Sequence, residues 1–177
     1  MTVGVRLSRD ADAALILDVV EDAFNSPEHD AKEEIDIVRS TWTACQPPRL
    51  LELVAHDGRN LVGHVMAAPG MLGWASGPHS HEALGVAPLS VAPERQGEGI
   101  GSALMHAVIE RADSKGVPLL LILGDPAYYE RFGFEAAWPL GISYGPAGKH
   151  SPHFMARRLT KYDKRLGLRG EFRYCWE

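Results

Sequence analysis

The sequence has few of the features that mark secreted, membrane or nucleic-acid-binding chains. Only two of its 177 residues are cysteine, Cys45 and Cys175, too few for a disulfide framework and without metal-ligand spacing. It has no apolar run long enough to span a bilayer. Its formal net charge of -5 leaves no basic footprint for nucleic acid. We therefore expect a cytoplasmic protein with two reduced thiols and with no membrane or nucleic acid as partner.

A glycine-rich stretch from Pro88 to Met105 is the most informative part of the chain. Leu89 to Val91 is typical of a strand end, Pro93 interrupts the ladder, and an apolar helical spacing begins at Ile100. The helix start has amides without intrahelical acceptors and the positive end of the helix dipole. Glycines in the connecting loop let a ligand approach the main chain. A strand, a glycine loop and a helix start predict an anion site, most naturally for phosphate.

Two common nucleotide motifs do not fit this loop. The Walker motif requires a lysine near the helix start, but Gly101 is followed by Ser102 and Ala103. The dinucleotide motif requires G-x-G-x-x-G, whereas the spacing here is G-x-G-x-G. A tight turn that binds nothing is the alternative to a phosphate site.

The rest of the chain alternates strand and helix patterns within one expected domain. An Asp57-Gly58 turn signal predicts a hairpin, and Asp125 with Pro126 is typical of a helix start. The glycine- and proline-rich segment from Pro69 to His81 is expected to be a loop. Strands are expected at Val3–Leu7, Leu50–Ala55, Leu61–Ala68, Ala83–Val91, Val117–Leu123, Phe134–Trp138 and His153–Leu159, and helices at about Ala11–Phe24, Glu28–Thr43 and Gly99–Lys115, with a short one after Asp125.

Two motifs resemble those of the GNAT N-acetyltransferase superfamily. Its acetyl-CoA loop has the signature Q/R-x-x-G-x-G/A, which Gln96-Gly97-Glu98-Gly99-Ile100-Gly101 matches at every fixed position. Downstream, Tyr129-Glu130-Arg131-Phe132-Gly133-Phe134 resembles the Y-x-x-x-G-F segment of the family. The two motifs occur in the expected order, and the resemblance extends over about Val3 to Leu159.

The resemblance implies an α/β (α+β) fold of the GNAT type. Its central sheet is mixed and mostly antiparallel, with about six or seven strands, about four helices, and a parallel pair at the fourth and fifth strands. A single domain is expected over residues 1–177, with its core at about 3–159 and a C-terminal tail at 160–177. The basic and aromatic residues of that tail favour packing against the domain over binding nucleic acid.

The resemblance also implies where acetyl-CoA binds. Backbone groups of Leu89, Ser90 and Val91 pair with the pantetheine arm, and the Val91 amide faces the acetyl oxygen. The pyrophosphate is held by main-chain amides, so Glu98 can point its carboxylate to solvent. The expected loop contacts are Gln96, Gly97, Glu98, Gly99, Ile100, Gly101 and Ser102.

Catalytic residues follow from the same resemblance. Tyr129 matches the tyrosine that protonates the leaving thiolate, with Tyr128 as an adjacent rival. Glu82 is the candidate general base, and His79 or His81 are alternatives acting through water. This histidine-rich cluster is better explained by a polar loop than by a metal site, so no metal is expected.

The expected function is acetyl transfer from acetyl-CoA to an amine by direct attack in a ternary complex. The alternative is a non-catalytic acyl-CoA-binding sensor or structural module. The acceptor, a small molecule or a protein amine, has no sequence code, and the frequent dimers of the family make a homodimer the expected assembly. One departure is Gly124-Asp125-Pro126, where many members carry an asparagine.

Overall fold

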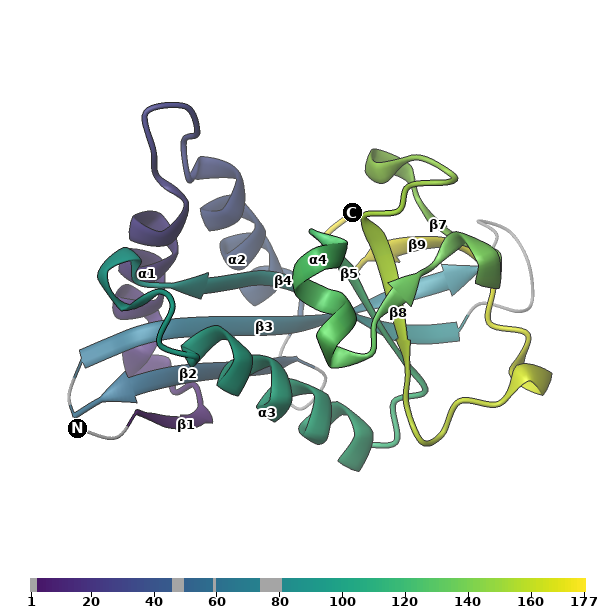
Figure 1. The fold of residues 1–177 in the computed structure, drawn as a ribbon, viewed down its shortest axis with the longest axis horizontal. Coiled ribbons are helices and arrows are strands. Elements are labelled where there is room, and N and C mark those ends of the chain that lie inside the picture. Colours follow the sequence, from purple (N-terminus) through teal and green to yellow (C-terminus); the bar gives the residue numbers. More distant parts are fainter. Residues whose placement is uncertain (1–2, 46–49, 59, 74–80) are drawn as a thin grey trace. The chain divides into compact units, whose positions relative to one another are not determined.

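A computed structural model describes residues 3–45, 50–58, 60–73 and 81–177, and Figure 1 shows its ribbon. The chain divides into two compact units. The first unit comprises Met1–Ala67, Ala87–Glu110 and Trp176, and the second comprises Ala68–Val86, Arg111–Cys175 and Glu177. Strands β3 (Asn60–Gly73) and β4 (His81–Val91) contribute residues to both units.

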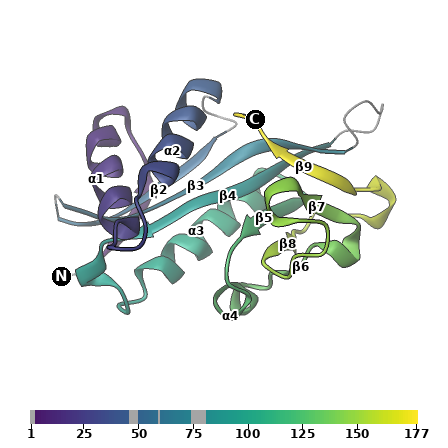
Figure 2. The same ribbon diagram turned by 90° about the horizontal axis from the view of Figure 1, so that it is seen from above.

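The first unit combines antiparallel strands with long helices. Strand β2 pairs with β1 from Gly4↔His56 to Leu7↔Leu53, and with β3 from Leu51↔Ala67 to Asp57↔Asn60. Helices α1 and α2 lie on one side of these strands and α3 lies on the other (Figure 2). Besides parts of β3 and β4, the elements are β1 (Gly4–Leu7), α1 (Ala13–Phe24), α2 (Lys32–Ala44), β2 (Leu51–Asp57) and most of α3 (Ile100–Ser114), with 3-10 turns at Asp10–Asp12 and Pro93–Arg95.

Apolar side chains fix these helices on the strands, and the start of α2 departs from the sequence-based expectation. In α1 the buried residues are Ile16, Val19 and Val20, whereas Leu15 is 43% exposed. Helix α2 begins at Lys32 rather than at residue 28, because Ser26 forms a local turn with His29. Such side-chain bonds to nearby backbone compete with helix formation.

The second unit contains the parallel pair. Strand β5 pairs in parallel with β4 from Leu84↔Leu120 to Val86↔Ile122, and antiparallel with β8. Strand β9 joins the end of β3, from Gly70↔Tyr174 to Gly73↔Glu171, and also pairs with β7. The elements are β5 (Leu119–Leu123), α4 (Pro126–Tyr129), β6 (Glu135–Ala136), β7 (Ile142–Tyr144), β8 (Phe154–Arg158) and β9 (Gly170–Tyr174), with 3-10 turns at Glu130–Phe132, Trp138–Leu140, Gly145–Ala147 and Lys164–Leu166.

The mixed sheet with its parallel β4–β5 pair and the four α-helices of the described chain confirm the expected architecture.

The expected loop from Pro69 to His81 is wrong in its first part, because β3 continues to Gly73. Strand β9 supplies the hydrogen-bonding partner for that continuation, and the Cys175 amide donates to the Pro69 carbonyl at 3.0 Å. Glycine and proline favour a loop locally, but pairing with another strand can override this preference.

The tail past residue 159 is part of the sheet rather than an appendage. His153–Leu159 was expected to be the last clear strand, but β9 follows it. Phe172 and Tyr174 are buried, as expected for a tail that packs its rings on the protein. Their ring centroids lie 4.8 Å apart, and Phe154 lies 6.4 Å from Phe172. This aromatic cluster is part of the core of the second unit.

We expect Gly70→Ala to lower the free energy of unfolding by about 1–3 kcal/mol, because overpacking forces neighbouring groups to shift. A Cβ at Gly70 would lie 2.5 Å from Cζ of Phe172 and would also collide with the Arg173 carbonyl oxygen. Urea unfolding measures the change. The control is Met71→Ala on the same strand, whose exposed side chain should contribute less than about 0.5 kcal/mol. Equal stability of G70A and wild type would contradict the β3–β9 pairing.

Candidate functional site

The glycine loop joins the end of β4 to the start of α3 within the first unit. Gly97 and Gly99 have φ angles of 80° and 83°, in the left-handed region that only glycine adopts readily. A Cβ at either position would meet nothing within 4 Å. Glycine is therefore required here by backbone conformation, and the outer side of the loop is open.

The first turn of α3 presents main-chain amides to this open side. The first helical bond runs from the Ala103 amide to the Gly99 carbonyl at 3.0 Å, so the amides of Ile100, Gly101 and Ser102 precede the helical ladder. Ile100 is buried and anchors the turn, whereas Gln96 to Gly99 are exposed. Exposed amides at a helix start can bind a phosphate group.

Side chains of the loop hold its shape. The Arg95 guanidinium donates to Asp57 at 3.1 Å and to Glu98 at 3.0 Å, and it thereby pairs with the carboxylate of Glu98 between the two glycines. The Gln96 amide nitrogen donates to the Val91 carbonyl at 3.2 Å. The loop is thus fastened both to the β2–β3 turn and to the last residue of β4.

Tyr129 lies in the second unit, at the end of α4. Asp125 caps this helix by accepting a hydrogen bond from the Ala127 amide at 3.0 Å, as the sequence indicated. The Tyr129 ring lies edge-on to Phe134, with 6.0 Å between centroids. A Cβ at Gly124 would collide with the Tyr129 ring. Burial, with a smaller effect of Tyr128, raises the pKa of Tyr129 to about 12, so its phenol keeps its proton at neutral pH.

The candidate bases are less well defined. Glu82 is exposed in the second residue of β4, and His81 begins that strand. His79 lies outside the described residues. Among the residues that the structure describes, no three His, Cys, Asp or Glu side chains are arranged to hold a metal ion.

Sequence reasoning missed a buried polar cluster in the first unit. The carboxylate of Glu52, on β2, accepts hydrogen bonds from Ser8 Oγ at 2.6 Å and from Trp42 Nε1 at 2.9 Å. Nε2 of His64, on β3, lies 3.1 Å from Glu52 Oε1. The detectable signal was a charged residue and a histidine in the middle of two apolar strand patterns, where polar groups need partners.

Burial raises the pKa of the Glu52 carboxyl, but the interactions that lower this pKa outweigh burial when taken together. The hydrogen bond and electrostatic interaction with His64, with the hydrogen bonds from Ser8 and Trp42, bring the pKa of Glu52 below the ordinary glutamate value. Glu52 is therefore ionised at neutral pH and acts as an acceptor at the centre of the cluster.

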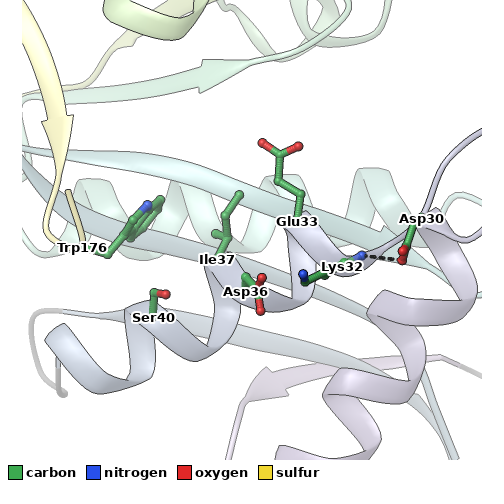
Figure 3. A pocket seen from close by; sticks show the side chains of 7 residues that line it. All are labelled: Asp30, Lys32, Glu33, Asp36, Ile37, Ser40 and Trp176. Carbon is green, nitrogen blue, oxygen red and sulfur yellow. Dashed lines mark hydrogen bonds between the residues drawn. The ribbon is translucent and has the colours of Figure 1, made fainter.

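A hollow of about 490 Å³ lies along α2. Figure 3 shows its lining side chains, with three carboxylates against one ammonium group and the indole of Trp176 at one side. Asp30 accepts a hydrogen bond from the Lys32 backbone amide at 3.0 Å. The excess of carboxylates favours a cation over an anion in this hollow. Its lining residues are Asp30, Lys32, Glu33, Asp36, Ile37, Ser40 and Trp176.

The cysteines differ from the expectation. Cys45 and Cys175 are both disulfide-bonded, so the prediction of two reduced thiols is wrong. When the two cysteines of a disulfide are distant in sequence, their spacing gives no indication that they are bonded. The inference of a cytoplasmic location loses this support, since disulfides are rare in the cytosol. None of the described helices has the length and apolarity needed to cross a bilayer.

The family model of the acetyltransferase (GNAT) domain matches residues 4–137, which is most of the chain. The chain therefore belongs to the GNAT acetyltransferase family. This family match includes the glycine loop and Tyr129.

Individual relatives are moderately similar. The uncharacterized N-acetyltransferase YjhQ of Escherichia coli K12 is 32% identical over 126 residues, which are 71% of this chain and 65% of YjhQ. The structure of E. coli YhbS in complex with CoA has a TM-score of 0.78 at 26% identity and covers 97% of this chain and 89% of YhbS. A GNAT acetyltransferase from Brucella melitensis in complex with acetyl-CoA has a TM-score of 0.76 at 28% identity, with 99% of both chains covered. The sequence match spans less than two thirds of YjhQ, and for YhbS it spans 32%.

We expect Glu52→Gln to lower the free energy of unfolding at pH 7 by about 1–3 kcal/mol, because it removes the charged acceptor of the cluster. The folded pKa of Glu52 is lowered, so this stabilisation is present above the unfolded pKa and is lost as the pH falls through the folded pKa.

Urea unfolding of wild type and E52Q at pH 7 and under acidic conditions below both pKa values tests this sign. The difference should shrink toward zero in acid, and the exposed control Glu21→Gln should show little difference at either pH. A difference that persists unchanged in acid would contradict an ionised Glu52.

Proposed function

We propose that this protein is an acetyl-CoA-dependent N-acetyltransferase that acts on an amine. The observation that carries the proposal is the glycine loop, whose left-handed Gly97 and Gly99 precede the free amides at the start of α3. Family membership supports it, as do the relatives solved with CoA or acetyl-CoA. Residues 1–177 are proposed to act as one acetyltransferase domain.

The loop is proposed to bind the pyrophosphate of acetyl-CoA through its main chain. The contacts are the amides from Gln96 to Ser102, at the positive end of the α3 dipole. Glu98 does not oppose an anionic ligand, because its carboxylate is paired with Arg95 at 3.0 Å.

The end of β4 is proposed to bind the pantetheine arm. The parallel register of β4 with β5 runs from Leu84 to Val86, and Leu89 to Val91 follow it along the strand. Their backbone groups pair with the arm, and the Val91 amide donates to the acetyl oxygen. The Gln96 bond to the Val91 carbonyl keeps this strand end in register with the loop. Positioning of this kind can account for about 7–11 kcal/mol of a lowered barrier in favourable cases.

Acetyl transfer then proceeds by direct attack. The amine nitrogen forms a bond to the acetyl carbon, negative charge builds on the acetyl oxygen, and the carbon–sulfur bond breaks. Tyr129 is the proposed general acid for the departing thiolate. Its pKa of about 12 lies above the value of about 8.5 for a cysteine thiol, so the phenol is protonated at neutral pH and can donate to the sulfur while charge develops. Glu82 is the general base proposed from the sequence.

The alternative is a module that binds acyl-CoA without catalysis. Both functions need the loop, and they differ only in turnover. The acceptor class stays open beyond an amine, although the acid-lined hollow on α2 is suited to a cation. A homodimer remains the expected assembly.

Calorimetric titration with acetyl-CoA, with NAD as the control ligand, tests the binding step. We expect saturable binding of acetyl-CoA and none of NAD, because the loop lacks the dinucleotide spacing. Thiol release in the presence of an amine panel then separates the enzyme from the binding module. Folded protein that does not bind acetyl-CoA would overturn both functions.

We expect Tyr129→Phe to lower kcat by about 10²–10⁴-fold, the usual contribution of a general acid, with acetyl-CoA affinity nearly unchanged. Thiol release and calorimetry measure the two quantities separately. The matched control is Tyr128→Phe, the neighbouring ring at 4.8 Å, which should retain turnover. If Y129F keeps wild-type kcat while Y128F loses it, the general acid is Tyr128.

A further inference from the structure

The buried Glu52–His64 pair has one feature that a structural role leaves unexplained. His64 and Ser90 are 0% and 1% exposed. Among the described residues, neither Nδ1 of His64 nor Oγ of Ser90 has a hydrogen-bond partner. Buried polar atoms without partners are uncommon in native proteins and often mark a functional group.

The ionised carboxylate of Glu52 determines the tautomer of His64. Oε1 of Glu52 can only accept, so Nε2 of His64 must carry the proton of their 3.1 Å contact. In a neutral ring this leaves Nδ1 as an acceptor with an unused lone pair. The His64 ring is thus arranged as a base that is oriented by a carboxylate through its other nitrogen.

The unpartnered hydroxyl lies on the neighbouring strand. The arrows of β3 and β4 run in opposite directions (Figure 1), and the Ala92 amide donates to the Val62 carbonyl at 3.1 Å. In an antiparallel ladder this bond places Val62 opposite Ala92, and hence His64 opposite Ser90. Directly opposite side chains lie on the same face of the sheet. The two unpartnered atoms are therefore a hydrogen-bond acceptor and a hydrogen-bond donor on adjacent strands, and they are not hydrogen-bonded to each other in this structure.

This face is the one that α1 and α2 cover. A Cβ at Gly63 would lie 3.0 Å from side-chain atoms of Ile100 and Leu104, so residue 63 faces α3 and residue 64 faces the opposite side. Trp42 of α2 bonds to the same Glu52 oxygen as His64. Figure 2 shows these helices on the side away from α3.

We propose that Ser90, His64 and Glu52 form a proton relay that accepts the proton of the attacking amine. The inference rests on the proposed acetyltransferase function. As the carbon–nitrogen bond forms, the surplus proton on nitrogen moves through one water to Oγ of Ser90, which is buried. The Ser90 proton passes to Nδ1 of His64 after the hydroxyl turns toward the ring, because the two atoms are not hydrogen-bonded in this structure. The carbon–sulfur bond breaks, and the sulfur leaves with its electron pair and accepts a hydrogen bond from Tyr129.

Glu52 stabilises the imidazolium that forms, and the relay later returns the proton to solvent. His64 and Glu52 act through Ser90 and are positioning residues, whereas the buried Ser90 hydroxyl exchanges the proton with the amine through one water. Ser90 precedes Val91, whose amide is the proposed donor to the acetyl oxygen. The relay thus ends at the strand segment assigned to the thioester.

The charges around His64 are few and paired. Glu52 is the charged group in contact with the ring. On β1, Arg6 lies opposite Val54, which lies opposite His64. Arg6 donates to both oxygens of Asp12, at 2.6 and 2.9 Å, and is neutralised there. From α2 the contact to the cluster is the uncharged Trp42, and from β4 it is Ser90. Among the residues that the structure describes, removal of the Glu52 charge therefore takes away the ion-pair partner of the ring.

The first test is His64→Gln, whose side-chain amide can still donate to Glu52 but is not a base. With an amine found in the thiol-release screen, kcat should fall at least 100-fold, while acetyl-CoA affinity and the urea midpoint stay near those of wild type. The matched control is the exposed His106→Gln on α3, which should retain kcat. Full turnover by H64Q would overturn the relay and leave the acetyltransferase function intact.

The relay also predicts non-additivity and a pH signature. Ser90→Ala should lose about as much kcat as H64Q, and the double variant should lose no more than either, because the groups act as one unit. Glu52→Gln makes the imidazolium harder to form, so the acid limb of its pH–rate profile should move to lower pH. A purely structural role would lower kcat evenly across pH and would let the H64Q and S90A losses multiply. The loss of kcat in Glu82→Gln, compared with the loss in H64Q, decides whether Glu82 or the relay accepts the proton.

A measurement without turnover tests the arrangement even if no acceptor is found. In ¹⁵N-histidine spectra of the full chain, the His64 signal is identified as the one that is missing from the H64Q spectrum. In the wild-type protein this signal should show a proton on Nε2 and a lone pair on Nδ1. S90A should alter the Nδ1 signal. A His64 protonated on Nδ1 would overturn the relay, whereas failure of acetyl-CoA to bind would overturn the proposed function.

Discussion

The change from strand to helix between Val91 and Ile100 is the constraint on which the proposed chemistry depends. The chain must leave β4, reverse and begin α3 within a few residues, and it does so with left-handed backbone at Gly97 and Gly99. Any other residue would have to adopt a conformation that costs roughly 1–2 kcal/mol. The Arg95 bridge and the Gln96 bond hold this path without relying on a ligand. The amides of the loop are therefore arranged before an anion arrives, which lowers the ordering cost of binding.

Local patterns were sufficient for much of the fold. The glycine loop and the cap at Asp125 follow from residue type and spacing, the parallel pair after α3 follows from the family resemblance, and each is present. The continuation of β3 to Gly73 could not be predicted in this way, because its partner β9 lies about a hundred residues later in the chain. The bonding state of Cys45 is a similar case. Long-range pairing leaves no local pattern.

The candidate site also has residues that local motifs predict and residues that only long-range strand pairing brings together. Loop contacts and Tyr129 were named from two short motifs, whereas the Glu52–His64–Ser90 cluster required strand register. Each of its members lies in an apolar run, where a single polar residue has no meaning until its neighbours are known. Register brings three such residues onto one sheet face, with the helix of Trp42 above them. A buried carboxylate that is fully hydrogen-bonded is stable there, and the unused atoms of His64 and Ser90 make the cluster more than a core feature.

Gly124 has a consequence for the position of the Tyr129 ring. The Tyr129 ring occupies the space into which any side chain at position 124 would project. An asparagine at the end of the fifth strand, which many members carry, is therefore incompatible with this ring position. In this chain glycine leaves that space to the Tyr129 ring, which packs edge-on against Phe134. The residue at position 124 thus decides where the phenol can lie.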